Sequence, residues 1–165
     1  MTKWVTLIFY CIFIQSCFGP SQSYPSSHQI AFVSSRNGNF EIYTMDINGF
    51  NQVNLTQNVA RDKYPKFSPD GSKLVFVSDR EGDYDIFIMT LEWYGGYTRY
   101  KGKNVINLSS QLGNDLHPEF SPTGLEIVFE SLQNGNYEIY SVDTLGNDKS
   151  NLTQSSGQDR KPKFS

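Results

Sequence analysis

The sequence predicts an all-β fold, a partial β-propeller of about three four-stranded blades. One segment recurs three times along the chain, over 29–71, 73–124 and 126–165. Landmark residues of successive copies lie at a regular interval, since Phe32 and Phe76 are 44 residues apart, and so are Pro118 and Pro162. Each copy consists of short apolar segments separated by turns rich in Gly, Asn and Pro. A period in the forties built from short strands is typical of a β-propeller.

The first two strands of each copy are joined by a tight turn. The first strands are apolar and cover 30–33, 74–77 and 127–129. The second strands are rich in aromatic residues and cover 40–45, 84–89 and 137–142. The turns between them contain Gly38, Gly82 and Gly135, where a tight hairpin requires a positive φ. Large apolar residues on both faces of the second strands indicate a sheet that is covered on both sides, as in a blade between two neighbours.

Two further strands complete each copy. The third strand ends in Asn-Leu-Thr or Asn-Leu-Ser, at 54–56, 107–109 and 151–153. The fourth contains Pro-x-Phe, at 65–67, 118–120 and 162–164. In the first two copies a Ser-Pro-x-Gly turn follows, in which Pro presets φ and Gly completes the turn. If the Pro-x-Phe strand is called a, the chain runs b-c-d, a-b-c-d, a-b-c-d, a, which is three blades in permuted order.

The blades of a propeller form a closed ring, and the sequence leaves three alternatives for how the ring is completed. Propellers normally have four to eight blades, so three blades leave two open faces. We expect the chain to be a fragment of a larger propeller. A homodimer that completes a propeller with three plus three blades is the second alternative, and an open stack of three blades is the third.

The repeat resembles that of a known family. The motifs are Pro-Lys-Phe-Ser-Pro-Asp-Gly at 65–71, Leu-Val-Phe-Val-Ser-Asp-Arg at 74–80, Asp-Ile-Phe at 85–87 and Asn-Leu at 107–108. Together they resemble the blade repeat of TolB-like β-propellers, which also occurs in the N-terminal propellers of some prolyl-oligopeptidase relatives. The resemblance covers residues 29–165. It implies a propeller that acts as a periplasmic platform for binding proteins.

The N-terminal region has the pattern of an export signal. Residues 1–17 begin with a positive charge and continue with an apolar run from 4 to 14, which suits a secretory signal and is shorter than a membrane span. The segment Ile14-Gln15-Ser16-Cys17 resembles a bacterial lipobox, which implies that Cys17 is lipidated. An ordinary cleaved signal and an uncleaved anchor are the alternatives. Residues 18–28 are rich in Ser and Pro and are expected to form a flexible tether.

Composition and motifs argue against several function classes. The net charge is −3 and there is no basic stripe, so we expect no nucleic-acid partner. The only histidines are His28 and His117, no Gly-x-Ser-x-Gly motif is present, and both cysteines, Cys11 and Cys17, lie in the signal region. We therefore expect no catalytic residues, no metal site and no cofactor. The four carboxylates between Asp79 and Asp85 are interpreted as a solvated turn rather than as a calcium site.

Copy two contains an insertion that the other copies lack. It covers Glu92–Lys103, where copy one has only residues 48–51. Trp, Tyr and Arg are enriched at binding hot spots. The predicted partner-binding residues are Trp93, Tyr94, Tyr97, Arg99 and Tyr100. The alternative is a longer hairpin whose aromatic side chains only pack on their own blade.

These observations favour a non-catalytic TolB-like propeller that acts as a protein-interaction module of the bacterial cell envelope. We expect it to be exported to the periplasm or the outer membrane, with a lipid anchor. Two alternatives belong to other classes. One is the propeller portion of a prolyl-oligopeptidase-like peptidase with a separate catalytic domain, and the other is an envelope propeller that binds glycans.

Overall fold

The computed structural model describes residues 29–93, 100–110 and 113–165 as eleven strands in three antiparallel sheets. The sheet of blade 1 contains β1 (Gln29–Ser34), β2 (Glu41–Asp46) and β3 (Val53–Asn54). Blade 2 contains β4 (Asp62–Phe67), β5 (Lys73–Ser78), β6 (Asp85–Trp93) and β7 (Tyr100–Asn107). Blade 3 contains β8 (Asp115–Phe120), β9 (Glu126–Gln133), β10 (Asn136–Asp143) and β11 (Ser150–Asn151).

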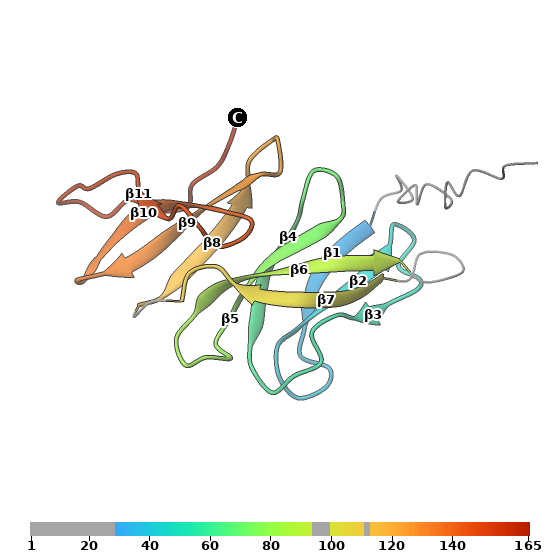
Figure 1. The fold of residues 1–165 in the computed structure, drawn as a ribbon. Helices are drawn as coiled ribbons and strands as arrows, with labels where there is room; N and C mark the ends of the chain where they lie inside the picture. Colours follow the sequence, from blue (N-terminus) through green and yellow to red (C-terminus); the bar gives the residue numbers. More distant parts are fainter. Residues whose placement is uncertain (1–28, 94–99, 111–112) are drawn as a thin grey trace, which may run out of the picture.

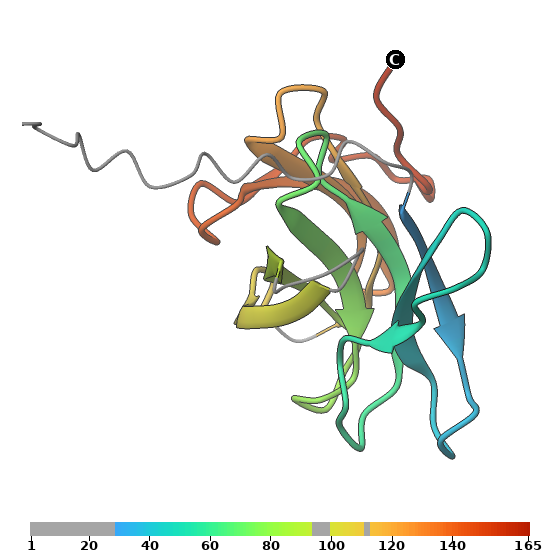
Figure 2. The same ribbon diagram turned by 90° about the vertical axis from the view of Figure 1, so that its right-hand side faces the viewer.

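The three sheets follow one another side by side, as blades of a propeller do (Figures 1 and 2). In each four-stranded sheet, neighbouring strands are consecutive in the sequence, and the Pro-x-Phe strand lies at one edge. The predicted all-β partial propeller with permuted strand order is therefore confirmed. The described residues contain no helix that is long and apolar enough to cross a membrane.

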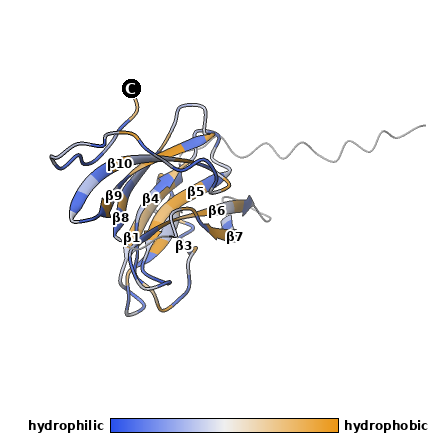
Figure 3. Cartoon of the chain, turned by 60° about the vertical axis from the view of Figure 1, so that its left-hand side comes forward, coloured by the Kyte–Doolittle hydropathy of each residue, from blue (hydrophilic) through white to orange (hydrophobic). Residues whose placement is uncertain are grey.

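The hydrophobic core lies between the blades rather than within one of them. Alternation along β5 explains this arrangement, because Leu74 and Phe76 pack toward blade 1 while Val75 and Val77 pack toward blade 3. All four side chains are fully buried. Figure 3 shows hydrophobic residues along the inner strands β5 and β6. The sequence predicted burial on both faces for the second strands, and β6 confirms it, because Ile86 and Ile88 lie in the core toward blade 3 while Phe87 and Met89 lie in the core toward blade 1.

The Asn-Leu-Thr motif fixes the end of each blade by hydrogen bonds. In blade 2 the amide of Asn107 donates to the carboxylate of Asp85 (2.8 Å), and its carbonyl oxygen accepts the backbone N–H of Ser109 (3.0 Å). The hydroxyl of Ser109 accepts the N–H of Ile86 (2.9 Å). Leu108, between them, is buried in the core that blades 2 and 3 share. The motif therefore recurs because it satisfies buried polar groups while its Leu fills the space between blades.

A backbone hydrogen bond links the start of each strand a to the preceding blade. The N–H of an Asp at the start of strand a donates to the carbonyl that follows the b–c turn of the preceding blade. These bonds are Asp62 to Phe40 (2.8 Å), Asp115 to Tyr84 (2.6 Å) and Asp159 to Tyr137 (2.8 Å). After Asp159 the structure assigns no strand to 161–164, although the sequence predicts one. Among the described residues no b strand pairs with this segment, so its backbone lacks the ladder that defines a strand.

Candidate functional site

The connection between strands c and d is a compact turn in blades 1 and 3. In blade 1 one carboxylate oxygen of Asp46 accepts the backbone N–H groups of Asn48 and Phe50, both at 2.9 Å. In blade 3 Asp143 accepts those of Leu145 (2.9 Å) and Asn147 (2.7 Å) in the same way. An aspartate at the end of strand c therefore closes the turn by satisfying two backbone donors.

Blade 2 has Thr90 at the equivalent position, and here the strands continue as a hairpin. β6 and β7 stay paired beyond Thr90 as far as Trp93 and Tyr100. A bulge separates this extension from the regular part of the sheet, because the register shifts between Ile88 and Thr90 and Asn104 has a φ of 51°. The bulge redirects the outer half of β7, as such insertions do in other sheets.

The hairpin has a buried base. The N–H of Leu91 donates to the carbonyl of Ser72 (2.8 Å), which places the extension beside the β4–β5 turn. Leu91 and Tyr100 are buried in the core between blades 1 and 2. Gly102 lies so close to its neighbours that an added Cβ would be 2.5 Å from the sulfur of Met89 and 3.2 Å from the carbonyl oxygen of Leu55. A larger residue at 102 would therefore have to displace the side chain of Met89 and shift slightly from the backbone of Leu55, so β7 and blade 1 are in close contact at this point.

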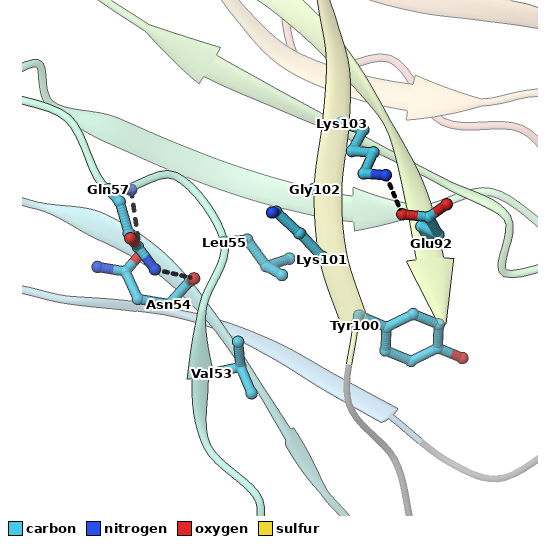
Figure 4. A pocket seen from close by; sticks show the side chains of 9 residues that line it. All are labelled: Val53, Asn54, Leu55, Gln57, Glu92, Tyr100, Lys101, Gly102 and Lys103. Carbon is cyan, nitrogen blue, oxygen red and sulfur yellow. Dashed lines mark hydrogen bonds and ion pairs between the residues drawn. The ribbon is translucent and has the colours of Figure 1, made fainter. Parts of the chain in front are cut away.

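A groove of about 650 Å³ lies between the hairpin and the outer end of blade 1. Its lining residues, labelled in Figure 4, are Val53, Asn54, Leu55, Gln57, Glu92, Tyr100, Lys101, Gly102 and Lys103. We refer to this space as the hairpin groove. One wall comes from β3 and the loop after it, and the other from β7 and the end of β6, so the two walls belong to different blades.

The polar side chains of the hairpin groove are held by defined partners. Lys103 forms an ion pair with Glu92 across the hairpin. On the opposite wall, the amide of Gln57 donates to the carbonyl of Asn54 (3.1 Å), and the amide of Asn54 donates to the buried carboxylate of Glu41. Lys101 is exposed at the same rim. Two lysines and one glutamate leave this rim with a net positive charge.

The predicted partner-binding residues divide into three groups. Trp93 is half-buried against the core between blades 1 and 2, and its indole N–H has no hydrogen-bond partner among the described residues. Tyr100 is only 3% exposed, so its ring supports the hairpin from inside. The structure does not describe the remaining three, Tyr94, Tyr97 and Arg99, nor the predicted lipidation site Cys17. Partner contact by these residues stays a prediction.

A second, smaller hollow of about 160 Å³ lies at the successive Pro-x-Phe segments. The residues before the prolines are Tyr64, His117 and Lys161, and all three have left-handed φ angles between 52° and 55°. The rings of Tyr64 and His117 lie 4.6 Å apart. A non-glycine residue in this region carries backbone strain. The three residues share one backbone conformation, so the strand accepts Tyr, His or Lys at this position.

The carboxylates that begin β4 and β8 occupy equivalent positions with different partners. Asp62 is fully buried and forms an ion pair with Arg80 (3.0 Å). Asp115 is also buried, and blade 3 has the neutral Gln133 where blade 2 has Arg80. Burial raises the pKa of Asp115 to about 6, although hydroxyl groups of Ser109 and Ser131 donate to it. Desolvation disfavours the charged form of a carboxyl group, and Asp115 lacks an arginine that would offset it.

Across the described residues, no group of three or more His, Cys, Asp or Glu side chains is arranged to hold a metal ion. In the acidic β5–β6 turn, Asp79 is bound by Arg61, whose backbone N–H and guanidinium both donate to it at 2.7 Å. The hairpin groove, at about 650 Å³ against about 160 Å³ for the hollow at the Pro-x-Phe segments, is the larger of the two and is the candidate binding site.

Four-stranded antiparallel sheets arranged as successive blades, with cores between them, define the protein as a β-propeller with one elaborated blade. The family model described as "TolB beta propeller domain" matches residues 11–101. This chain belongs to the TolB β-propeller family.

Two curated relatives and one solved structure are similar to the chain. It is 33% identical to a protein TolB homolog of Chlorobium chlorochromatii over 83% of this chain and 29% of that protein. It is 49% identical to the Tol-Pal system protein TolB of Geobacter sulfurreducens over 47 residues, 28% of this chain and 11% of the relative. A solved structure assigned to TolB from Agrobacterium tumefaciens has a TM-score of 0.63 at 24% identity, covering 74% of this chain and 44% of that one. The chain thus spans less than a third of the curated relatives, and the solved structure supports the fold alone.

Proposed function

We propose that this chain is a non-catalytic protein-interaction module of the bacterial cell envelope and that its partner binds in the hairpin groove. Membership of the TolB family supports the interaction role, because one relative is named as a Tol-Pal system protein. The groove supports the location of the site, since it is formed by the part of blade 2 that departs from the repeat.

The hairpin has the properties of a preorganised binding surface. Its base is fixed by Leu91 and Tyr100, which are buried, and by the close approach of Gly102 to blade 1. A partner that binds a fixed surface loses less conformational freedom than one that must order a loop. The hairpin can therefore present Trp93 and the polar rim without a change in the blade.

The chemistry of the groove indicates the kind of partner segment. The rim offers Lys101 and Lys103 against Glu92, and the floor offers the apolar side chains of Val53 and Leu55. We propose a protein segment that carries a carboxylate for the lysines and an apolar side chain for the floor. Electrostatic complementarity of this kind gives specificity and speeds association.

Charge reversal at the rim tests this function. The Pal component of the same Tol-Pal system is the probe, and its binding to the purified protein is measured by calorimetry. Lys101→Glu should weaken binding at least tenfold. Leu145→Glu adds one negative charge at the exposed compact turn of blade 3 and serves as the control for a glutamate outside the groove. Equal affinity of both variants would contradict the hairpin groove as the site, and binding of glycan fragments with no binding of Pal would favour the glycan alternative.

The lipid anchor is part of the same proposal. The lipobox-like sequence before Cys17 supports it. In a bacterial host the protein should incorporate labelled palmitate, and Cys17→Ala should be released in soluble form without label. If the variant stays in the membrane fraction and still carries label, the lipoprotein hypothesis is wrong.

A further inference from the structure

β7 gives blade 2 a longer outer edge than the other two blades have. It contains eight residues, whereas its counterparts β3 and β11 contain two each. It is the last strand of its sheet, and among the described residues only β6 pairs with it. An edge strand directs the N–H and C=O of every second residue outward, where a further strand can pair with them.

The pairing of β6 determines which backbone groups of β7 point outward. The N–H of Leu91 donates to the carbonyl of Ser72 (2.8 Å), so the backbone of Leu91 faces the β5 side of the sheet. Leu91 lies directly opposite Gly102 in the ladder of β6 and β7. Opposed residues of an antiparallel ladder either exchange hydrogen bonds or both face away, so the N–H and C=O of Gly102 point away from β6. Within the described part of the chain, no backbone hydrogen bond joins Gly102 to blade 1.

The hairpin groove runs along this outer edge. Four successive residues of β7, 100–103, line it from one side, as the labels in Figure 4 show. Successive side chains of a strand point to opposite faces of the sheet, so a groove lined by all four lies at the edge of the strand rather than on one face. Gly102 has no side chain to cover its backbone there. The outward-facing donor and acceptor of Gly102 are therefore directed toward a ligand in the groove.

The two faces of a strand added at this edge would meet different surroundings. Lys101 and Lys103 share one face of β7, and both are exposed. Gly102 belongs to the other face, which is turned toward blade 1, where Val53 and Leu55 line the groove. Directly opposite residues of neighbouring strands share a face and interact. Residues opposite the lysines are therefore expected to be acidic, and the residue opposite Gly102 is expected to be apolar.

We propose that the hairpin groove binds its partner by strand addition. An extended segment with the pattern acidic–apolar–acidic pairs antiparallel with β7, and its central residue exchanges two backbone hydrogen bonds with Gly102. This mode of binding rests on the proposed function and specifies the conformation and the sequence pattern of the bound segment. The described ladders are all antiparallel, and in an antiparallel pair one outward-facing residue makes both bonds. The acidic residues bind Lys101 and Lys103, which outnumber the single carboxylate of Glu92 in the groove.

Backbone methylation of a synthetic peptide tests the proposal. The probe is acetyl-Thr-Glu-Val-Glu-Thr-amide, titrated into the isotope-labelled protein and followed by NMR. Binding should shift the amide signal of Gly102 and slow its hydrogen exchange, because its N–H gains an acceptor. N-methylation of the valine removes the N–H that donates to the carbonyl of Gly102 and should weaken binding at least about tenfold.

The matched control is the same peptide N-methylated at the second glutamate. The N–H of that residue faces away from β7, so its affinity should change by less than about threefold. A peptide with Lys-Val-Lys in place of Glu-Val-Glu should not bind, because its charges repel Lys101 and Lys103. Equal affinity of the two methylated peptides would overturn strand addition, as would an unmethylated peptide that does not bind or leaves the exchange of Gly102 unchanged.

The complex with Pal separates this proposal from the proposed function. If Lys101→Glu weakens Pal binding but the amide of Gly102 exchanges equally fast in the free unchanged protein and in its Pal complex, the groove is the site and strand addition is wrong. If Pal does not bind at all, the proposed partner is wrong, and the two methylated peptides still decide whether β7 accepts an added strand.

Discussion

Blades 2 and 3 are built on the same four strands and differ in two places. Strand c of blade 3 ends at Asp143, which closes a compact turn, whereas blade 2 has Thr90 and an extended hairpin. The first strand of blade 2 begins with an aspartate paired with Arg80, whereas its counterpart in blade 3, Asp115, has no arginine. Both differences lie at the ends of strands. The first three strands pair in the same register in the two blades, and we call these paired strands the shared frame.

The comparison shows which parts of a blade are required and which can vary. The strand pairing is the same in both blades, and each has a Leu at the same place in its third-strand motif, although only Leu108 is buried between two blades. The turn and the buried carboxylate can vary, because each is satisfied locally. Function is therefore expected at the variable turn, while the stability of the blade depends on the shared frame.

The largest change in stability is expected for a substitution in the core between two blades. Leu108→Ala should lower the free energy of unfolding by about 2–5 kcal/mol, because Leu108 is 4% exposed in the core of blades 2 and 3. Leu152 is its counterpart at 56% exposure, and Leu152→Ala should cost less than about 1 kcal/mol. Urea denaturation gives the two values, and equal losses would show that burial between blades is not the source of the stability that Leu108 contributes.

Exchanging the residues at the two carboxylate sites should change stability in opposite directions. Arg80→Gln leaves Asp62 buried without its cation and should cost about 3 kcal/mol at pH 7. Gln133→Arg supplies a cation near Asp115 and should stabilise the protein. Thermal unfolding of both variants at neutral pH is the measurement. A loss of stability in Gln133→Arg would show that blade 3 has no space for the arginine that blade 2 holds.

The same contrast predicts a pH dependence that is specific to blade 3. The folded pKa of Asp115, about 6, lies above its unfolded value near 4. Protonation is therefore favoured in the folded state, and the stability that this group contributes is lost as the pH rises from about 4 to above 6. The loss is up to about 3 kcal/mol. Asp115→Asn should remove this part of the profile when unfolding is followed between pH 4 and pH 8, and an unchanged profile would exclude Asp115 as its source.

The smallest effect is expected at the compact turn. Asp143→Ala removes an acceptor for two backbone N–H groups and should cost about 1 kcal/mol. Thr90→Ala, at the equivalent position of blade 2, should change stability by less than about 0.5 kcal/mol, because the strands there remain paired. Chemical denaturation of the two variants distinguishes them. If both cost the same, the aspartate is not what closes the turn.

Much of the fold could be predicted from the sequence, because the signals are local and repeated. A turn glycine such as Gly38 and the apolar runs of β5 and β9 define strands without knowledge of their neighbours. Three copies of one pattern then define three blades. The insertion in copy two was also visible, since a departure from a repeat is a local feature as well.

The binding surface could be predicted only in part. The sequence identified Trp93 and Tyr100 as members of one segment, and the structure places Tyr100 inside the core. The opposite wall of the hairpin groove, formed by Asn54 and Gln57, carries no signal of its own, because Asn recurs in all three copies and Gln in copies one and three. A groove between two blades depends on how they dock, and no single segment encodes it.

The sequence alone thus determined the blade, its strand order and the site of the insertion, because hydrophobic period and turn chemistry act over a few residues. Tertiary structure decided which side chains meet across blades. The ion pair of Arg80 with Asp62, the raised pKa of Asp115 and the approach of Gly102 to Leu55 all join residues that are distant along the chain. Their energies depend on burial and separation, which exist only after the sheets have packed.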